Sequence, residues 1–174
     1  MILFPKQDAQ SMTNFYGQPW KVVSTGIVLD PHFETINIRR IDAPYEMWMG
    51  ETKITKIAIN KKCADSLIRI LTKIQKSISK SERKTFGLDQ YGGGFNFRPI
   101  RGVDGKFTVG KLSTHAYGAA IDLAPHLNPL GRFYDPSKFM MPHQVITIFK
   151  DEGWVWGGDF KTRPDCMHFQ ATEV

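Results

Sequence analysis

Apolar residues in the middle of the chain recur three and four positions apart, which is the spacing of a helix with one buried face. The stretch 62–79 shows this pattern most clearly, through Ala64, Leu67, Leu71, Ile74 and Ile78. Lysines and arginines take many of the positions between them. We therefore predict a core helix at 62–79, capped by Asn60, with a basic outer face.

A second, shorter helix is predicted at 142–152. Pro142 suits the first turn, where its missing N–H is not needed, and Gly153 provides a stop. Val145, Ile146 and Phe149 would form the buried face of this helix. The sequence thus predicts two amphipathic helices of unequal length.

Short runs of β-branched and aromatic residues predict the strands. The runs 22–29 and 33–41 are separated by the turn signal Asp30-Pro31, so we expect them to pair as a hairpin. Further strands are expected at 54–59, 95–98, 119–123 and 154–156. Irregular structure is expected in an arm at 1–20 anchored by Phe15, Tyr16 and Trp20, a charged loop at 80–89 and a hairpin loop at 102–110.

Length and composition are those of one soluble domain. A chain of 174 residues can bury a substantial core but leaves no room for a sizeable second module, so we expect one domain, 1–174. No apolar run approaches the roughly 20 residues that cross a bilayer. The segment Met1–Asp8 lacks the cationic start and apolar core of a signal peptide, so cytoplasmic synthesis without ordinary secretion is expected. Cys63 and Cys166 have no metal-type spacing and are expected to be free thiols.

The net charge of +6 is unevenly distributed. Residues 1–112 hold 18 Lys and Arg against 10 Asp and Glu, whereas residues 113–174 hold 5 against 7. A basic face would attract anionic polymers at long range. A lysine-rich surface that serves only solubility accounts for the same counts.

A histidine and a carboxylate lie seven positions apart in the otherwise apolar or small run 112–123. On the predicted strand, Asp122 points to the opposite face from Ile121 and Leu123. Burying this carboxylate without a partner would cost several kcal/mol, so it needs hydrogen bonds, a cation or a metal. A structural His115–Asp122 pair and a metal site both meet that need.

A second Asp and His follow near the end of the chain, spaced D-x-x-H at Asp165 and His168. Zinc hydrolases usually bind the ion through three protein ligands and keep one position for water, whose pKa falls to about 7. His115, Asp122 and His168 fit that count, and Asp165 is then the candidate general base. His126, just after the strand, is the rival for the third ligand position.

The D-x-x-H spacing makes a demand on the backbone. Positions three apart on an ideal strand face opposite ways. Asp165 and His168 can therefore serve one site only if the chain bends near Pro164.

Three sequence blocks occur in the order Ser113-x-His115-x-x-Gly118-x-Ala120-x-Asp122, Gly153-Trp154-x-Trp156-Gly157-Gly158-Asp159 and Asp165-x-x-His168-Phe169. Together they resemble the zinc peptidase family of D-Ala-D-Ala carboxypeptidases and L-alanyl-D-glutamate endopeptidases, which includes phage endolysins. The direct likeness runs from about Gly92 to the C-terminus. It implies an α+β fold of the Hedgehog/DD-peptidase kind: a small, mostly antiparallel sheet that carries the metal site, with flanking helices.

The resemblance also implies the metal chemistry. One zinc ion per chain would be held by His115, Asp122 and His168, and Asp165 would take the proton from the attacking water. Some relatives carry Glu in place of Asp165, so the base is one methylene shorter here. Many relatives also carry Trp where this chain has Phe160.

Substrate-binding residues follow from the same resemblance. Related enzymes have an arginine upstream of the Ser-x-His block that helps to polarise the scissile carbonyl. The segment 95–99 matches that block, which makes Arg98 the candidate and Arg101 its nearby competitor. Ser113, Tyr117 and Trp154 are expected to line the substrate site.

The expected function is zinc-dependent hydrolysis of peptidoglycan stem peptides, foremost as an L-alanyl-D-glutamate endopeptidase of the endolysin type. A D-Ala-D-Ala carboxypeptidase and a non-catalytic, zinc-stabilised binding module are the alternatives. Expected partners are the stem peptide and, through the basic face, anionic wall polymers. We expect a monomer with no membrane span and no separate wall-binding domain, which reaches the cell wall after lysis or by delivery in a phage or phage-like particle.

Overall fold

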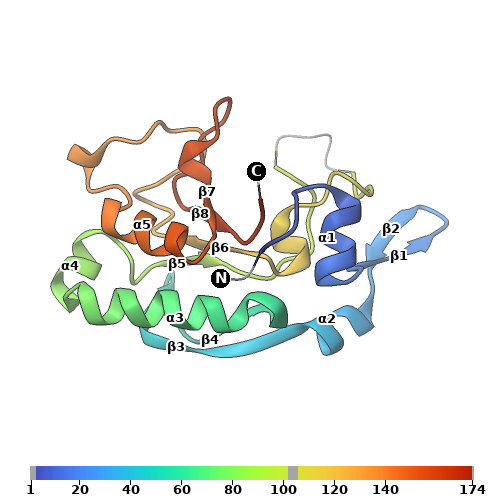
Figure 1. Cartoon of the computed structure of the whole chain (residues 1–174), viewed down its shortest axis with the longest axis horizontal. Coiled ribbons are helices and arrows are strands. Elements are labelled where there is room, and N and C mark those ends of the chain that lie inside the picture. Colours follow the sequence, from blue (N-terminus) through green and yellow to red (C-terminus); the bar gives the residue numbers. More distant parts are fainter. Residues whose placement is uncertain (1–2, 102–105, 174) are drawn as a thin grey trace.

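The computed structural model describes residues 3–101 and 106–173. These residues form five α-helices and three antiparallel sheets (Figure 1), which confirms the predicted α+β class. The three sheets are two hairpins and one four-stranded sheet. Within the described residues, no helix combines the length and apolar character needed to cross a bilayer.

A long hairpin and the helix that follows it form the frame of the molecule. Strand β3 (Ile38–Met49) pairs with β4 (Thr52–Asn60), so the predicted strand at 54–59 is one arm of a longer hairpin. Helix α3 (Lys61–Ser77) starts directly after β4 and runs along the hairpin (Figure 1). Asn60 caps it by accepting a hydrogen bond from the backbone N–H of Lys62. The predicted helix at 62–79 is confirmed, with its ends shifted by one or two residues.

The first 20 residues differ from the prediction of an irregular arm. They contain helix α1 (Ala9–Tyr16), which Asp8 caps by accepting from the backbone N–H of Ser11. Tyr16 and Trp20 are buried and anchor this part of the chain, as expected. The helix was missed because an eight-residue segment shows barely two turns of apolar spacing.

The predicted pairing of 22–29 with 33–41 is wrong. The N-terminal hairpin consists of β1 (Trp20–Val23) and β2 (Gly26–Leu29). Asp30-Pro31 does not join two strands but starts helix α2 (Pro31–Asn37), with the Asp30 carboxylate accepting from the backbone N–H of His32. An Asp followed by Pro is also the signature of a helix N-cap, and that reading applies here.

The predicted charged loop at 80–89 contains helix α4 (Lys80–Thr85). Ser79 and Glu82 form a capping box, in which each side chain binds the backbone N–H of the other residue. No residue of α4 is buried, so no apolar stripe marks this helix in the sequence.

The predicted strand at 95–98 is also wrong. The strand of this region is β5 (Tyr91–Gly93), which ends two residues before the predicted one begins. The tip of the predicted hairpin loop at 102–110 lies outside the described residues.

The four-stranded sheet contains residues of the three sequence blocks and has the order β5-β6-β8-β7. Its other strands are β6 (Ala120–Leu123), β7 (Val155–Trp156) and β8 (His168–Gln170). The antiparallel register of β6 and β8 places Asp122 directly opposite His168. Two residues that are far apart in sequence thus become neighbours on adjacent strands.

Helix α5 (His143–Asp151) lies between this sheet and α3 (Figure 1). The ring of Phe149 stacks on that of Phe169 with their centroids 3.8 Å apart, which fixes α5 against β8. The predicted helix at 142–152 is confirmed, with Pro142 as the residue before its first turn. The core therefore packs against one face of β8, and the polar side chains of β8 face the site.

Candidate metal centre

A tight turn between Ser113 and Gly118 positions His115. Ser113 Oγ accepts from the backbone N–H of His115, and Thr114–Tyr117 form a single 3₁₀ turn. Gly118 closes the turn with a left-handed φ of +67°. A Cβ at Gly118 would lie 2.6 Å from Ile38 Cδ1 and 2.9 Å from the backbone N of Asn60. Both backbone conformation and space therefore require glycine here, so the S-x-H-x-x-G spacing encodes the turn that carries His115.

A second turn positions His168 at the start of β8. The backbone N–H of His168 donates to the carbonyl of Asp165 at 3.0 Å, so the chain bends between them as the D-x-x-H spacing requires. Gly157 packs against this bend: a Cβ there would lie only 2.5 Å from the Asp165 carbonyl oxygen. The Trp-Gly-Gly block thus provides the space for the turn before His168.

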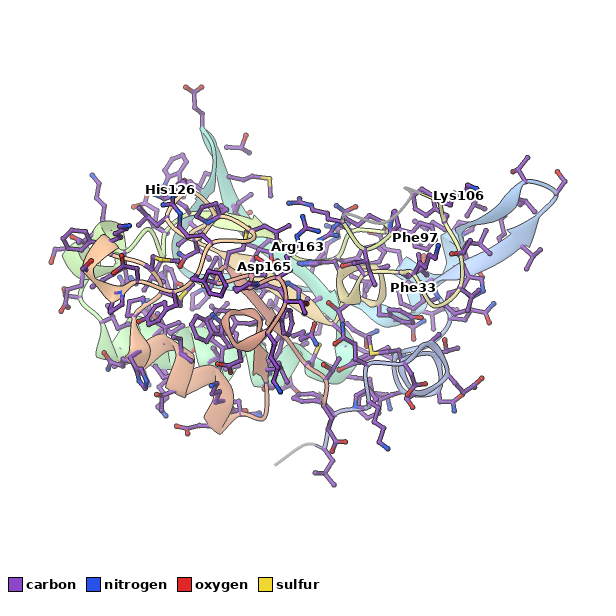
Figure 2. The ribbon with its side chains drawn as sticks, turned by 90° about the horizontal axis from the view of Figure 1, so that it is seen from above. Phe33, Phe97, Lys106, His126, Arg163 and Asp165 are labelled. Atoms are coloured by element: carbon purple, nitrogen blue, oxygen red, sulfur yellow. The ribbon has the colours of Figure 1, made fainter. Side chains whose placement is uncertain are left out.

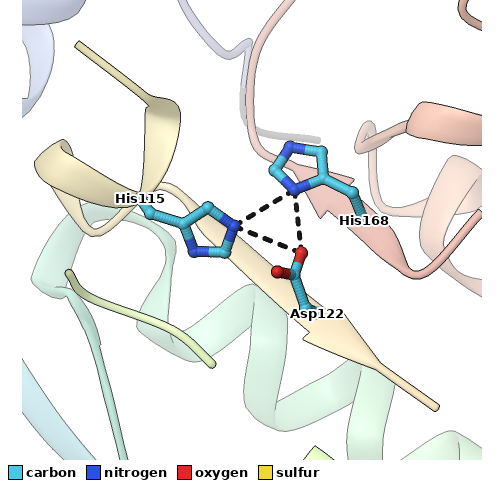
Figure 3. A group of neighbouring side chains, drawn as sticks. All are labelled: His115, Asp122 and His168. Carbon is cyan, nitrogen blue, oxygen red and sulfur yellow. Dashed lines mark hydrogen bonds and ion pairs between the residues drawn. The ribbon is translucent and has the colours of Figure 1, made fainter. Parts of the chain in front are cut away.

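The side chains of His115, Asp122 and His168 converge on one point (Figure 3). His115 Nε2 lies 3.2 Å from both Asp122 Oδ1 and His168 Nδ1, and His168 Nδ1 lies 2.9 Å from Asp122 Oδ1. Tetrahedral zinc with bonds of about 2.0–2.1 Å separates its ligand atoms by about 3.3 Å. The triangle is close to one face of such a tetrahedron, so these residues fit a zinc ion.

The outward-facing nitrogen of each ring has a partner of its own. His115 Nδ1 donates to the carbonyl of Gly94 at 2.7 Å, and His168 Nε2 donates to Gln170 Oε1 at 3.0 Å. With these protons assigned, His115 Nε2 and His168 Nδ1 present lone pairs to the centre. Metal-binding histidines are held in this way in proteins generally.

The electrostatics of the triad also favour a cation. Burial alone would raise the pKa of Asp122, but in the metal-free site the contacts with His115 and His168, which need a proton on the facing ring nitrogen, outweigh burial and hold this pKa well below its usual range. Burial lowers the pKa of His115. Among the described residues, the ion-pair partners of Asp122 are the two histidines. A buried negative charge between two imidazoles is a strong attraction for a metal ion.

A cavity of about 310 Å³ adjoins the triad, and both Asp122 and His168 reach its wall. Asp165 lies in the same wall, and its Oδ1 is buried without a hydrogen-bond partner among the described residues. Burial raises the pKa of Asp165 to about 6. A carboxylate with a free oxygen and a pKa near neutrality can accept a proton and give it back. This geometry supports Asp165 as the base and leaves its assignment a prediction.

Arg98, its competitor Arg101 and the expected substrate residue Ser113 all line the cavity. Arg163, which the sequence analysis did not single out, lies beside Asp165 in Figure 2 and also lines the cavity. Arg163 Nη1 donates to the carbonyl of Arg101 at 2.8 Å, so the two arginines lie next to each other at the rim. Arg163 was missed because it falls just outside the motif blocks.

Tyr117 and Trp154 do not line this cavity. Tyr117 is buried with its ring edge against Trp20. Trp154 lies in the core, where its indole N–H donates to Ser66 Oγ at 3.0 Å. Both side chains pack in the core, and Trp154 also lines a neighbouring hollow. Their assignment as substrate residues stays a prediction.

His126, the rival ligand, lies apart from the triad. It is exposed and lines a different hollow, beside Gly87 and Pro125. Figure 2 shows it well away from Asp165. Cys166 is buried as a free thiol, and burial raises its pKa to about 11, so it is not poised as a nucleophile.

Comparison with known families agrees with this site. Residues 108–171 match the family model described as D-alanyl-D-alanine carboxypeptidase. The matched segment contains the three candidate ligands and Asp165, and it confirms the resemblance found in the sequence blocks. No solved structure matches the chain.

Proposed function

We propose, from the confirmed likeness of residues 108–171 to the zinc-dependent D-alanyl-D-alanine carboxypeptidase family, that this protein hydrolyses a peptide bond in peptidoglycan stem peptides. The finer assignment that we propose is an L-alanyl-D-glutamate endopeptidase. One observation carries the enzymatic reading: the buried triangle of His115, Asp122 and His168 opens on a cavity that also contains the unpartnered carboxylate oxygen of Asp165. A purely structural site would have no use for that carboxylate.

The proposed roles follow from the chemistry of the residues. Zinc held by His115, Asp122 and His168 would supply a Lewis acid for the scissile carbonyl and would lower the pKa of a water molecule. Asp165 would accept a proton from the attacking water and, once protonated, pass it to the leaving amine. Arg98, half-buried in the cavity wall, would donate hydrogen bonds to the carbonyl oxygen as negative charge develops on it.

The charge of the cavity wall supports an acidic substrate. Arg98, Arg101 and Arg163 line it, against the carboxylates of Asp122 and Asp165. Once Asp122 is engaged with a metal, the remaining charge is positive. D-glutamate, which continues the stem through its γ-carboxyl group, and a C-terminal D-alanine both carry a free α-carboxylate on the leaving side of the bond. Guanidinium groups bind carboxylates well, so this wall suits both substrates.

The extent of the hollowed surface favours the endopeptidase. Phe160 and Thr162 line the metal-site cavity and also a second hollow of about 650 Å³. An endopeptidase must hold peptide on both sides of the scissile bond, whereas a carboxypeptidase binds a chain end. The carboxypeptidase is the second candidate because it is the activity in the description of the matching family.

The decisive experiment measures the release of new amino groups from purified peptidoglycan, followed by mass spectrometry of the fragments. We expect activity that is lost with a chelator and restored by zinc, with metal analysis giving one zinc per chain. Fragments with a new N-terminal D-glutamate identify the endopeptidase, and release of free D-alanine identifies the carboxypeptidase. A matched pair of synthetic stem peptides, each containing only one of the two bonds, provides the control.

The same experiment can also show that the protein is not a peptidase. If the protein binds zinc but leaves walls of several envelope types and both peptides intact, then the zinc-stabilised binding module replaces the peptidase as the proposed function. If the protein binds no zinc under any condition, the metal site itself is wrong.

A further inference from the structure

His168 is the metal-site residue whose support comes from other side chains. Its Nε2 lies 3.0 Å from Gln170 Oε1, two residues along the same strand. Gln170 is 1% exposed, so its amide group is cut off from bulk water. Thr114 Oγ1 lies 3.4 Å from the same nitrogen, so the amide of Gln170 is the nearer of two polar groups at the outward edge of the His168 ring.

The other end of the same amide has two fixed partners. Gln170 Nε2 donates to Gln7 Oε1 at 2.8 Å and to Thr172 Oγ1 at 2.7 Å. With both of its N–H groups engaged, the amide turns its oxygen towards His168. An oxygen there requires a proton on His168 Nε2, which leaves Nδ1 free to bind a metal. The orientation of one amide thus selects the tautomer that zinc needs.

Gln7 brings the N-terminal arm into this network. The arm, residues 3–8, runs beside the last residues of the chain near the middle of the molecule (Figure 1). Lys6 forms a parallel bridge with Glu173, and the backbone N–H of Glu173 donates to the carbonyl of Pro5 at 2.8 Å. These contacts hold Gln7 in place although its own side chain is exposed and also lines the substrate cavity.

We propose that Gln170 is a positioning residue for the metal ligand His168, and that the N-terminal arm completes the metal site through Gln7. The inference rests on the zinc site of the proposed function. It extends that site to residue 7, which lies outside the segment that matches the family, 108–171. The arm then helps to orient a ligand of the metal centre.

Zinc affinity, measured by competition with a chromophoric chelator in the absence of substrate, tests the role of Gln170. Gln170→Met keeps the size of the side chain but removes the acceptor, and we expect zinc affinity to fall roughly 10- to 100-fold. Gln170→Glu keeps an acceptor for His168 Nε2–H but loses the N–H groups that bind Gln7 and Thr172, so we expect a loss of affinity no larger than that of Gln7→Ala, about three- to tenfold. Rescue by Glu but not by Met separates positioning of His168 from simple packing.

Cobalt substitution gives a readout that does not depend on activity. The visible absorption of bound Co²⁺ reports ligand geometry, so we expect an altered spectrum for Gln170→Met and a near-native one for Gln170→Glu. Far-ultraviolet circular dichroism and the melting temperature of the metal-free proteins show whether each variant is folded. Zinc affinity and a cobalt spectrum unchanged in folded Gln170→Met would overturn the role of Gln170.

The arm is tested by Gln7→Ala, for which we expect a smaller loss of zinc affinity, about three- to tenfold, because water can reach the exposed position and replace part of the contact. Gln10→Ala is the matched control: Gln10 is an exposed glutamine of the same region whose side chain donates to Asn14. Gln7→Ala with wild-type affinity, or the same loss in Gln10→Ala, would overturn the role of the arm. Wild-type protein that binds zinc but cleaves no substrate would count against the proposed peptidase and not against this inference.

Discussion

The two histidines of the metal site are supported by different regions of the molecule. His115 sits on a turn built from its own neighbours, Ser113 to Gly118, and its ring donates to a backbone carbonyl, that of Gly94. His168 sits on a strand, and its ring is held by the side chain of Gln170, which in turn contacts Gln7, 163 residues away in sequence. One ligand is supported by local backbone geometry and the other by long-range side-chain contacts.

This difference bears on how the site can change. A backbone carbonyl cannot be removed by a side-chain substitution, so the orientation of His115 depends on keeping the turn. The orientation of His168 depends on the chemistry of two amide side chains, either of which one substitution removes. We therefore expect the His115 side to respond to changes in backbone conformation and the His168 side to changes in hydrogen-bonding groups.

The largest effect is expected from removal of the ligands themselves. His115→Ala, Asp122→Ala and His168→Ala should each lose both stoichiometric zinc and peptidase activity, because two remaining ligands hold zinc much less tightly than three. Metal analysis after dialysis and the amino-group release assay measure the two quantities. A variant that keeps zinc would show that its residue is not a ligand. The two histidines would then differ in their structural support without both being metal ligands.

Asp165→Asn is expected to separate chemistry from metal binding. The amide cannot accept the proton of the attacking water, so turnover should fall roughly 10²- to 10⁴-fold, while zinc content stays near that of the wild type. Turnover on the synthetic stem peptide and metal analysis of the same sample provide the test. Loss of zinc in step with activity would contradict the role of Asp165 and place it among the supports of His168.

Gly118→Ala tests the backbone support of His115. The alanine would have to adopt the left-handed conformation and would collide with Ile38 and Asn60, so we expect a loss of about 3 kcal/mol or more, or a melting temperature lower by about 6–12 °C. Gly131→Ala is the matched control, because its φ is +85° but nothing lies within 4 Å of the added Cβ. It should cost only about 1–2 kcal/mol.

Thermal unfolding of the two glycine variants gives the answer. Equal shifts would mean that the close contacts at Gly118 are easily relieved, and that the turn is less tightly specified than the geometry indicates. A larger shift for Gly118→Ala, with weakened zinc binding, would confirm that the backbone of this turn controls His115.

The contrast between the two sides also explains which parts of the site the sequence could predict. The S-x-H-x-x-G spacing determines its own turn, so His115 and Asp122 could be placed from local rules. His168 could be proposed from the D-x-x-H spacing once a third ligand was needed. Gln7 could not, because its contact with Gln170 exists only after both ends of the chain meet beside β8.

In the fold, too, elements specified by local sequence patterns could be predicted and those that depend on long-range packing could not. Helix α3 has 17 residues and a continuous apolar stripe, and its position was found within two residues. Helix α4 has six residues and none of them is buried, so only its capping box could have revealed it. Asp30-Pro31 was misread because a helix start and a turn use the same residues, and only the packing of the following segment distinguishes them. Tyr117 and Trp154 lie within or beside motif blocks, yet the core takes up their side chains.

The smallest effect is expected from a contact that touches neither histidine. Glu152, at the end of α5, accepts hydrogen bonds from Arg69 and Ser66 of α3. The hydrogen bond from Arg69 is the main cause that lowers the pKa of Glu152 below its ordinary value of 4.5. Because the pKa of Glu152 is lower in the folded state, the contact stabilises the protein at pH values above the ordinary pKa. This stabilisation is lost as the pH falls through the pKa that Glu152 has in the folded protein.

Glu152→Gln should therefore lower the melting temperature at pH 7 by about 2–4 °C, corresponding to about 1 kcal/mol, and the difference from the wild type should shrink as the pH falls below the ordinary pKa of 4.5. Zinc affinity should be unchanged, since Glu152 fixes α5 to α3 and leaves both metal-site supports intact. Thermal melts at several pH values and the chelator competition measure both. A loss of zinc affinity as large as that of Gln170→Met would mean that His168 is held by the whole α3–α5 frame, because no hydrogen bond of its own network would have been touched.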